Sequence, residues 1–432
     1  MLKPIKKIHL NNGLQIMLKE IHTAPIISHW LWYRVGSRDE IPGKTGVSHW
    51  VEHMQFKGTP KFPADEIETA ISRTGGIRNA FTYVDWTTYY ETMPADKIDL
   101  ALQFEADRMT NSSFDPAEVK SERTVIISER QGRENSPGFL LSEAIRAAAF
   151  RVHPYHHEIV GDMIDLETMT RDDLYDHYRA YYQPNNAILT IAGDFETETM
   201  LERVRELHSA IPARDTPPPR VNRPEPTLRG EHRLTVEGPG ETTMVEVAYR
   251  TPTATNPDFF ALLVLDSLLT GASGLNLFGG GGISNKTSRL YTSMIEEKNV
   301  AVDVMGGLPA TIDPFLQSIH FIVHPQKTVA EALAVMDGEI QRLQDTPPDR
   351  QEIDRAVKQT RALFAYGGES ITNQAFWMGF SEMFASYEWV VKYVDSLASV
   401  TPEDVQRVAQ TYLQPKNRLI GTYLPKNEKM TA

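Results

Sequence analysis

The sequence predicts an α+β protein built from two homologous domains, each with a mainly antiparallel sheet packed against helices. Two observations lead to this prediction. Strand-like and helical segments are mixed along both halves of the chain, and one stretch of sequence occurs twice. Residues 170–186 align without gaps on residues 401–417, and Thr, Asp, Tyr, Gln, Pro and Asn recur in register. A helix, a Gln-Pro turn and a strand should therefore close both halves.

The pattern of apolar residues predicts the elements of the first half. Alternating apolar positions indicate strands, and spacings of three or four residues indicate helices. In chain order the predicted elements are paired strands within 8–35 with a turn at Asn11-Asn12-Gly13, helices over 46–56 and 63–75, strands within 77–92, helices over 98–109, 116–131, 140–149 and 170–182, and a buried strand over 187–192.

A proline-rich segment divides the chain. Between residues 212 and 230 several prolines lie among charged residues, a composition typical of an extended, semi-rigid linker. The predicted organisation is a first domain over 1–213, a linker over 214–230 and a second domain over 231–432. The elements predicted for the second domain are strands over 244–249 and 317–323, and helices over 258–269, 329–344 and 349–366.

Length and composition set the first limits on function. The chain has 432 residues, of which 41% are hydrophobic and 23% charged, an ordinary globular composition. Its formal net charge of −13 disfavours a nucleic-acid partner, because phosphate binding needs a clustered basic surface. Without cysteine, any metal must be held by His and carboxylate side chains. No apolar run approaches a membrane span and no signal peptide is recognisable, so we expect a cytoplasmic protein with no membrane partner.

The strongest chemical signal is the pentapeptide His49-Trp50-Val51-Glu52-His53. Two histidines four residues apart on a helix share one face, so both imidazoles can reach one metal ion, and the adjacent Glu52 can reach a water molecule on it. This H-x-x-E-H order is the inverse of the commoner metallopeptidase motif. A third ligand is expected on another helix, and the segment that begins at Asp115 offers Glu122 and Glu129 on one face.

With these residues the chain resembles the insulinase/pitrilysin family, M16, of inverted-motif zinc peptidases, and within it the bacterial two-domain members related to mitochondrial processing peptidase. The family pattern is H-x-x-E-H, about seventy residues, then E-x-x-x-x-x-x-E. The resemblance implies zinc held by His49, His53 and Glu129, with Glu52 as general base and Glu122 as a carboxylate that orients a ligand imidazole. It also implies two domains that face each other across a cleft and form half of a clamshell.

The segment Arg78-Asn79-Ala80-Phe81-Thr82 resembles the family strand that receives the substrate at a sheet edge. The resemblance therefore implies that Asn79, Ala80 and Phe81 bind the substrate backbone as an added strand, a mode that suits peptides of any sequence. Residues 87–90 are predicted to form a neighbouring core strand. Whether Tyr83, Trp86 and Tyr90 belong to the core or line the substrate site is left open.

Two further patterns are weaker. His153, His156 and His157 could suggest a second metal, but they include a proline and lack an acidic partner, so we do not expect one. The run from Gly279 to Ser288 nearly matches a nucleotide-binding loop, but Asn285 replaces the Gly required before Lys286. We expect a mobile Gly-rich loop over the cleft instead, resembling a shortened form of the loop in the non-catalytic subunit of mitochondrial processing peptidase.

The chain departs from the family at one place. Family members that act alone or as homodimers read S-R-L-x-x-x-x-R-E-K-x-G-x-x-Y, where the Arg and Tyr steady the oxyanion, but here Ile295 and Val302 stand at those positions. Neither side chain can donate a hydrogen bond. We therefore predict a heterodimer in which a related zinc-free subunit supplies the Arg and Tyr. The alternative is a homodimer in which Arg289, Tyr291 or Lys298 substitutes for them.

These patterns predict a zinc metalloendopeptidase that hydrolyses short or unfolded peptides in a closed chamber. The alternative is a non-catalytic structural subunit like the core proteins of respiratory complexes. Those proteins typically have eroded metal ligands, whereas His49, Glu52, His53 and Glu129 are all present here. The sequence leaves open whether manganese or cobalt replaces zinc.

Overall fold

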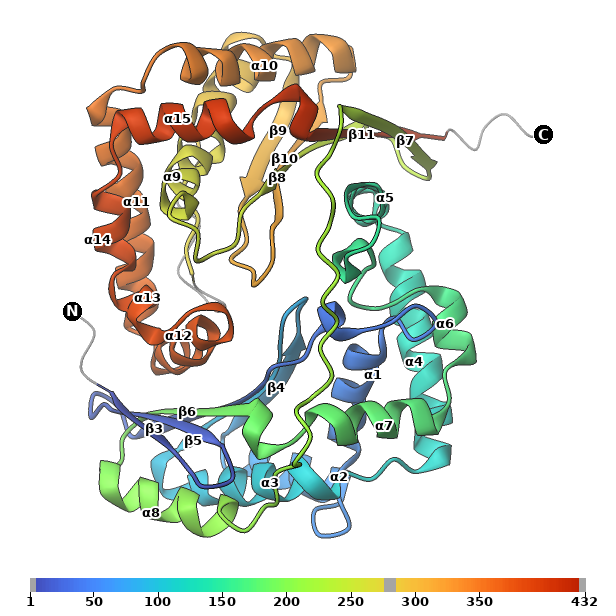
Figure 1. Ribbon diagram of the computed structural model, residues 1–432, viewed down its shortest axis with the longest axis vertical. Coiled ribbons are helices and arrows are strands. Elements are labelled where there is room, and N and C mark those ends of the chain that lie inside the picture. Colours follow the sequence, from blue (N-terminus) through green and yellow to red (C-terminus); the bar gives the residue numbers. More distant parts are fainter. Residues whose placement is uncertain (1–4, 276–284, 427–432) are drawn as a thin grey trace. The chain divides into compact units, whose positions relative to one another are not determined.

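The computed structural model describes residues 5–275 and 285–426, which form two compact units (Figure 1). The first unit combines Met1–Arg130, His157–Arg223 and Gly368–Tyr387, and the second combines Gln131–His156, Pro224–Gly367 and Glu388–Ala432. Each unit therefore takes a segment from the other half of the sequence. The Gly-rich run Gly279–Gly282, where a mobile loop over the cleft is predicted, lies outside the described residues.

The first unit contains a six-stranded sheet in the order β1-β2-β6-β3-β5-β4. Neighbouring strands are antiparallel except for the parallel pair β2 and β6. The strands are β1 (Lys6–His9), β2 (Gln15–Glu20), β3 (Ile26–Tyr33), β4 (Ile77–Thr82), β5 (Thr87–Pro94) and β6 (Ala187–Gly193). Strand β3 is buried along almost its whole length, because helices cover both of its faces.

The second unit contains a five-stranded sheet in the order β7-β11-β8-β10-β9, again antiparallel except for one parallel pair, β7 and β11. The strands are β7 (His232–Gly238), β8 (Met244–Thr251), β9 (Ala301–Gly307), β10 (Phe315–Val323) and β11 (Arg418–Pro425). This topology repeats that of β2 to β6 strand for strand. The predicted α+β class with two homologous domains is confirmed.

The α-helices occupy most of the remaining chain. They are α1 (Val47–Met54), α2 (Ala64–Arg73), α3 (Ile98–Asn111), α4 (Pro116–Glu134), α5 (Pro137–Ala149), α6 (Met163–Thr168), α7 (Arg171–Tyr181), α8 (Thr197–His208), α9 (Phe259–Thr270), α10 (Val329–Asp345), α11 (Arg350–Gly368), α12 (Ile371–Phe384), α13 (Tyr387–Val391), α14 (Tyr393–Ala398) and α15 (Pro402–Tyr412). The remaining helices were predicted from the sequence, whereas α6, α8, α12, α13 and α14 were not.

Each sheet has one face covered by a helix from the other half of the sequence. In the first unit α12 lies on β3 and β6, where Phe376 contacts the rings of Trp30 and Trp32 (Figure 1). Gly379 permits this close packing, because a Cβ there would lie 2.0 Å from Nε1 of Trp32. In the second unit α5 lies on β11 and β8. The two sheets thus complete their cores in the same way.

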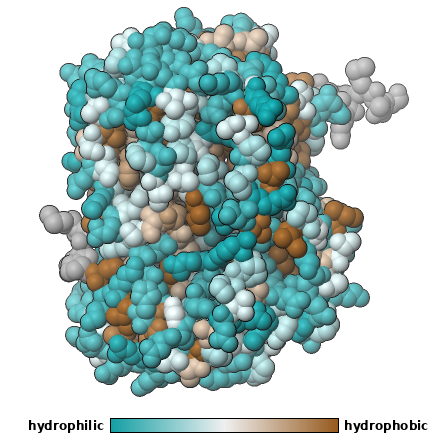
Figure 2. Space-filling view, viewed as in Figure 1, coloured by the Kyte–Doolittle hydropathy of each residue, from teal (hydrophilic) through white to brown (hydrophobic). Residues whose placement is uncertain are grey.

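On the face shown in Figure 2 hydrophilic side chains predominate and hydrophobic residues form small separate groups. Among the described helices, none combines the length and the hydropathy that a membrane crossing requires.

Candidate metal centre

The H-x-x-E-H motif lies on α1, as predicted. The helix begins after Gly46, and nearly all of its residues are buried, including His49 and Glu52. Because His49 and His53 are one turn apart, both imidazoles project from the same side of α1, with ring centroids 4.6 Å apart. A local sequence pattern is therefore enough to bring two of the predicted ligands together.

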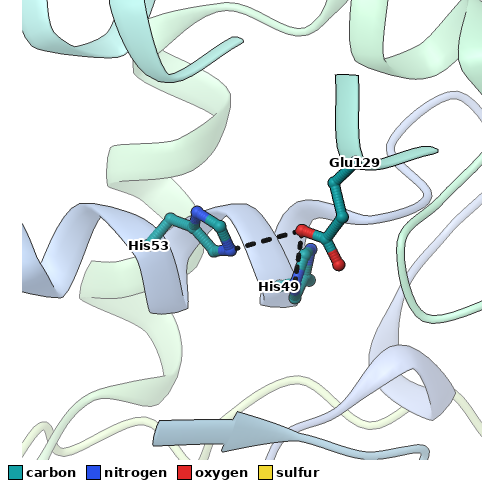
Figure 3. A group of neighbouring side chains, drawn as sticks. All are labelled: His49, His53 and Glu129. Carbon is teal, nitrogen blue, oxygen red and sulfur yellow. Dashed lines mark ion pairs between the residues drawn. The ribbon is translucent and has the colours of Figure 1, made fainter. Parts of the chain in front are cut away.

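The third predicted ligand comes from α4. Figure 3 shows the Glu129 carboxylate reaching the two imidazoles, with its Oε2 atom 3.7 Å from Nε2 of His49 and 3.7 Å from Nε2 of His53. The three ligand atoms lie within 4.8 Å of one another. Donors bound tetrahedrally to zinc at about 2.1 Å lie roughly 3.4 Å apart, so this donor set fits one zinc ion.

The predicted orienting carboxylate, Glu122, contacts the other side of His53. Nδ1 of His53 donates a hydrogen bond to Oε1 of Glu122 over 2.8 Å, which leaves Nε2 facing Glu129. Burial disfavours the charged form of Glu122, but hydrogen bonds from His53 and Lys57 hold its pKa below the usual value. Lys57, whose Nζ lies 2.5 Å from Oε2 of Glu122, was not identified from the sequence.

The predicted general base, Glu52, is buried beside the ligands. Burial raises the pKa of Glu52 to about 7, although a hydrogen bond from Thr82 and the charge of His53 act in the opposite direction. The Thr82 hydroxyl donates to Oε2 of Glu52 over 2.6 Å. Thr82 ends strand β4, so this contact joins the metal-site helix to the edge of the sheet. Thr82 ends the segment 78–82 that resembles the substrate-binding strand, but the sequence predicted no role for its side chain.

A cavity of about 480 Å³ adjoins these residues. Its walls include Glu52, His53 and Glu122 from the candidate centre, together with Phe56 and Asn79. It therefore offers space for a side chain of a bound molecule directly beside His53.

The predicted substrate strand, β4, lies at the edge of the first sheet and, among the described strands, pairs only with β5. Asn79 is exposed, Ala80 is buried and Phe81 is half-buried. The Asn79 side chain accepts a hydrogen bond from the Ala80 backbone N–H over 2.9 Å. The edge strand is thus placed next to the candidate centre through Thr82, as strand addition by a peptide requires.

Two sequence families match successive parts of the chain. Residues 15–163 match the family described as insulinase, peptidase family M16, and residues 168–360 match the peptidase M16 inactive domain. The chain belongs to the insulinase family, M16. The second match agrees with the absence of an H-x-x-E-H sequence after residue 230.

Individual relatives support this assignment. An uncharacterized zinc protease of Streptomyces coelicolor is 28% identical over 427 residues, covering 96% of this chain and 89% of that protein. A probable mitochondrial-processing peptidase subunit beta of Arabidopsis thaliana is 29% identical over 294 residues, covering 68% of this chain and 55% of that protein. The crystal structure of a protease from Helicobacter pylori matches with a TM-score of 0.92 and 25% identity, covering 98% of this chain and 100% of that chain. The predicted metal, zinc, is the metal of the insulinase family.

The aromatic residues near β4 belong to the core of this insulinase-family unit. Tyr90 stacks on Trp30 with ring centroids 4.3 Å apart, and Trp86 packs edge-on against Trp32 at 5.2 Å. Tyr83 packs on Trp86 and is half-buried. Trp86 and Tyr90 are therefore buried core residues, whereas Tyr83 lies at the margin of the core.

Each of the three histidines after α5 has a hydrogen-bond partner, and for His153 and His157 that partner is acidic, contrary to the expectation from the sequence. Nε2 of His153 lies 3.0 Å from Oδ2 of Asp313, Nδ1 of His156 bonds the His153 carbonyl, and Nε2 of His157 lies 2.8 Å from Oε2 of Glu40. Within the described ranges they do not form a metal-binding group, whereas Glu20, His22 and Glu196 have ligand atoms within 4.8 Å of one another. That second group is largely exposed, and both His22 nitrogens already bond Asp194 and Glu20.

The region that departs from the insulinase-family pattern lies in the second unit. Ile295 is half-buried in a π-helical turn, Tyr291–Glu297, and Val302 is 49% exposed on β9. Asn299, which replaces the Gly of the pattern, adopts φ of 50°, a left-handed conformation that Asn tolerates better than most residues. The Arg289 guanidinium is held by both carboxylate oxygens of Glu352, at 3.2 and 2.6 Å.

Proposed function

We propose that this chain is the zinc-bearing subunit of a metalloendopeptidase that hydrolyses short or unfolded peptides. The observation that carries the proposal is the convergence of His49, His53 and Glu129 with Glu52 beside them. An ion held by three protein ligands keeps a position open for water or substrate, as catalytic rather than structural zinc sites do.

The residues divide the chemistry among them. When bound, zinc would polarise the scissile carbonyl and increase the acidity of a water molecule at its open position. Glu52 would take a proton from the attacking water and deliver it to the leaving nitrogen. Thr82 would orient the Glu52 carboxylate, and Glu122 would hold the His53 ring with Nε2 toward the metal.

The substrate backbone would add to strand β4 as a further antiparallel strand along Asn79, Ala80 and Phe81. An incoming carbonyl would replace the Asn79 side chain at the Ala80 N–H. The cavity beside His53 would then receive a substrate side chain next to the scissile bond. Selection of extended segments follows, because most backbone N–H and C=O groups of a folded protein are already paired within it.

We further propose that the working unit is a heterodimer with a related zinc-free subunit. Ile295 and Val302 cannot donate hydrogen bonds to a developing oxyanion, and Glu352 already engages the neighbouring Arg289. A partner that supplies the Arg and Tyr would restore this stabilisation. The Arabidopsis relative is itself named as a subunit of a processing peptidase. A closed chamber formed by the two subunits would exclude folded proteins.

The test is cleavage of a quenched, unstructured peptide by the chain alone and by the chain mixed with a related zinc-free M16 subunit. We expect activity in the mixture, and a loss of about 100- to 10,000-fold in the Glu52→Gln variant, since general acid–base catalysis contributes that much. The variant should still bind one zinc ion, because Glu52 is not among the three ligands.

Each other result excludes a defined part of the proposal. Full activity of the chain alone would keep the endopeptidase and remove the heterodimer. A zinc-loaded chain that cleaves nothing in any mixture would instead support a non-catalytic structural subunit. Cleavage retained by Glu52→Gln would contradict the assignment of the general base.

A further inference from the structure

A buried carboxylate lies at the first turn of the metal-site helix. Glu40 is 2% exposed, and its two oxygens accept hydrogen bonds from the backbone N–H groups of Gly46 and Ser48, each over 2.8 Å. Nε2 of His157 lies 2.8 Å from the same carboxylate. All of these residues belong to the first unit. The Glu40 side chain thus binds both the N-cap residue of α1 and the residue before ligand His49.

Helix α1 cannot cap itself with its own N-cap side chain. The N-cap is Gly46, whose φ of 84° is strained for any other residue, and a Cβ there would lie 2.4 Å from the Val160 carbonyl oxygen. Most helices satisfy their first N–H groups with a Ser, Thr, Asp or Asn at this position. Here Glu40 supplies that acceptor from outside the helix and places a negative charge at the positive end of the helix dipole.

The segment before Glu40 also fixes the strand that carries Thr82. The backbone N–H groups of Ser37 and Arg38 donate to the carbonyls of Tyr83 and Val84, over 3.3 and 2.8 Å. The Ser48 hydroxyl donates to the Gly36 carbonyl over 3.2 Å. One segment therefore anchors both the beginning of α1 and the turn after β4.

We infer that Glu40 is a positioning residue for the zinc centre, holding the first turn of α1 so that His49 meets His53 and Glu129 at one ion. His49 follows Ser48 directly, whereas His53 lies a full turn later, so loss of the cap displaces one ligand relative to the other two. His157 contacts the same Glu40 oxygen, Oε2, that accepts from Gly46, which gives that histidine a role other than metal binding. The inference rests on the proposed zinc centre.

The test compares Glu40→Gln with a matched control, Asp165→Asn. Asp165 is also a buried carboxylate with two hydrogen bonds, from the Thr45 N–H over 2.9 Å and its hydroxyl over 2.7 Å, but Thr45 precedes the N-cap. Zinc affinity is measured by competition with a chromogenic chelator. We expect Glu40→Gln to weaken zinc binding about 10- to 100-fold, as changes in groups that support metal ligands do. Asp165→Asn should change it less than about threefold while lowering the melting temperature to a similar extent.

A spectroscopic readout separates positioning from general destabilisation. With Co²⁺ in place of zinc, the visible absorption bands report the ligand geometry, and we expect them to shift in Glu40→Gln but not in Asp165→Asn. Should Glu40→Gln fail to fold, Glu40→Asp keeps the charge but shortens the reach, and it should weaken zinc binding by a smaller factor.

Three results would overturn the inference: unchanged zinc affinity in Glu40→Gln, unchanged affinity in Glu40→Asp when Glu40→Gln does not fold, or equal weakening in Asp165→Asn. Failure of the proposed peptidase is distinguishable, because zinc binding is measured without any peptide. A wild-type chain that binds zinc tightly but cleaves nothing leaves the role of Glu40 intact, whereas a wild-type chain that binds no zinc removes both.

Discussion

The hydrogen bond from the Thr82 hydroxyl to the Glu52 carboxylate affects the pKa of Glu52. Burial raises the pKa of Glu52 to about 7, and the 2.6 Å hydrogen bond from Thr82 opposes that rise by stabilising the ionised form. The proposed general base must be ionised before it can accept a proton, so in the proposed mechanism this contact would favour the form of Glu52 that acts near neutral pH.

We expect Thr82→Val to shift the acid limb of the pH–activity profile. Loss of the hydroxyl removes a hydrogen-bond donor to the charged form of Glu52, so the pKa of Glu52 should increase further. The pH range over which kcat/KM increases should then shift upward by about one pH unit. Thr82→Ser keeps the donor and is the control, with an expected limb close to that of the wild type. An unchanged acid limb in Thr82→Val would show that the contact does not control the ionisation of Glu52.

At the scale of elements, the two halves repeat not only their strands but also their local contacts. Helices α7 and α15 begin with the same capping box, in which Thr170 pairs with Asp173 and Thr401 pairs with Asp404. After each helix an Asn side chain donates to the carbonyl of the last helical residue, at 2.9 Å in the first unit and 2.8 Å in the second. The Thr, Asp and Asn residues that recur in the sequence repeat are therefore the ones that cap the start of each helix and bond its last carbonyl.

Replacing either capping threonine, Thr170 or Thr401, should lower the free energy of unfolding by a similar amount. Thr170→Ala and Thr401→Ala each remove the acceptor for an N–H of the first turn, so we expect the free energy of unfolding to fall by about 1 kcal/mol in each case. Denaturant unfolding, followed for the unit that contains the changed helix, measures the loss. Serine retains the acceptor, and both Thr→Ser variants should remain within a few tenths of a kcal/mol of the wild type. A Thr401→Ala variant with the same free energy of unfolding as the wild type would contradict a stabilising role for the capping box of α15.

At the scale of the whole molecule, the compact units do not coincide with the two halves of the sequence. The sheet of the first unit buries Trp30 and Trp32 beneath α12, which follows the second sheet's strand β10 in the chain. The sheet of the second unit packs on α5, which precedes the proline-rich segment. Each half of the sequence therefore lacks a helix that completes the core of its own sheet.

We expect a fragment of residues 1–213 to expose apolar surface and aggregate. It contains the first sheet without α12, and it contains α5 without the strands on which α5 packs. Binding of a hydrophobic dye and light scattering measure the exposure. The same fragment with residues 368–387 attached through a flexible linker should bind less dye, because α12 would again cover β3 and β6. A soluble, dye-free 1–213 fragment would show that the exchanged helix is dispensable.

Much of this protein could be predicted from the sequence because the relevant patterns are local. The spacing of four residues in His49 and His53 puts both on one helical face, and the spacing of seven in Glu122 and Glu129 turns both toward the same side of α4. The repeated capping and turn residues identified the duplicated domain, and alternating apolar residues identified most strands of the sheets. The sequence by itself thus determined the fold class and the membership of the insulinase family, and it predicted the metal ligands His49, His53 and Glu129 that the structure brings together.

Only the tertiary structure decided which side chains support those residues. Thr82 and Glu40 contact α1 from other elements, and Lys57 reaches Glu122 on a different helix, so no spacing in the sequence identifies them. The raised pKa of Glu52 and the exchange of α5 and α12 depend on burial, which is set by residues far apart in the chain. The physical reason is that helix and strand periodicity are local properties, whereas burial and packing arise only when distant segments meet.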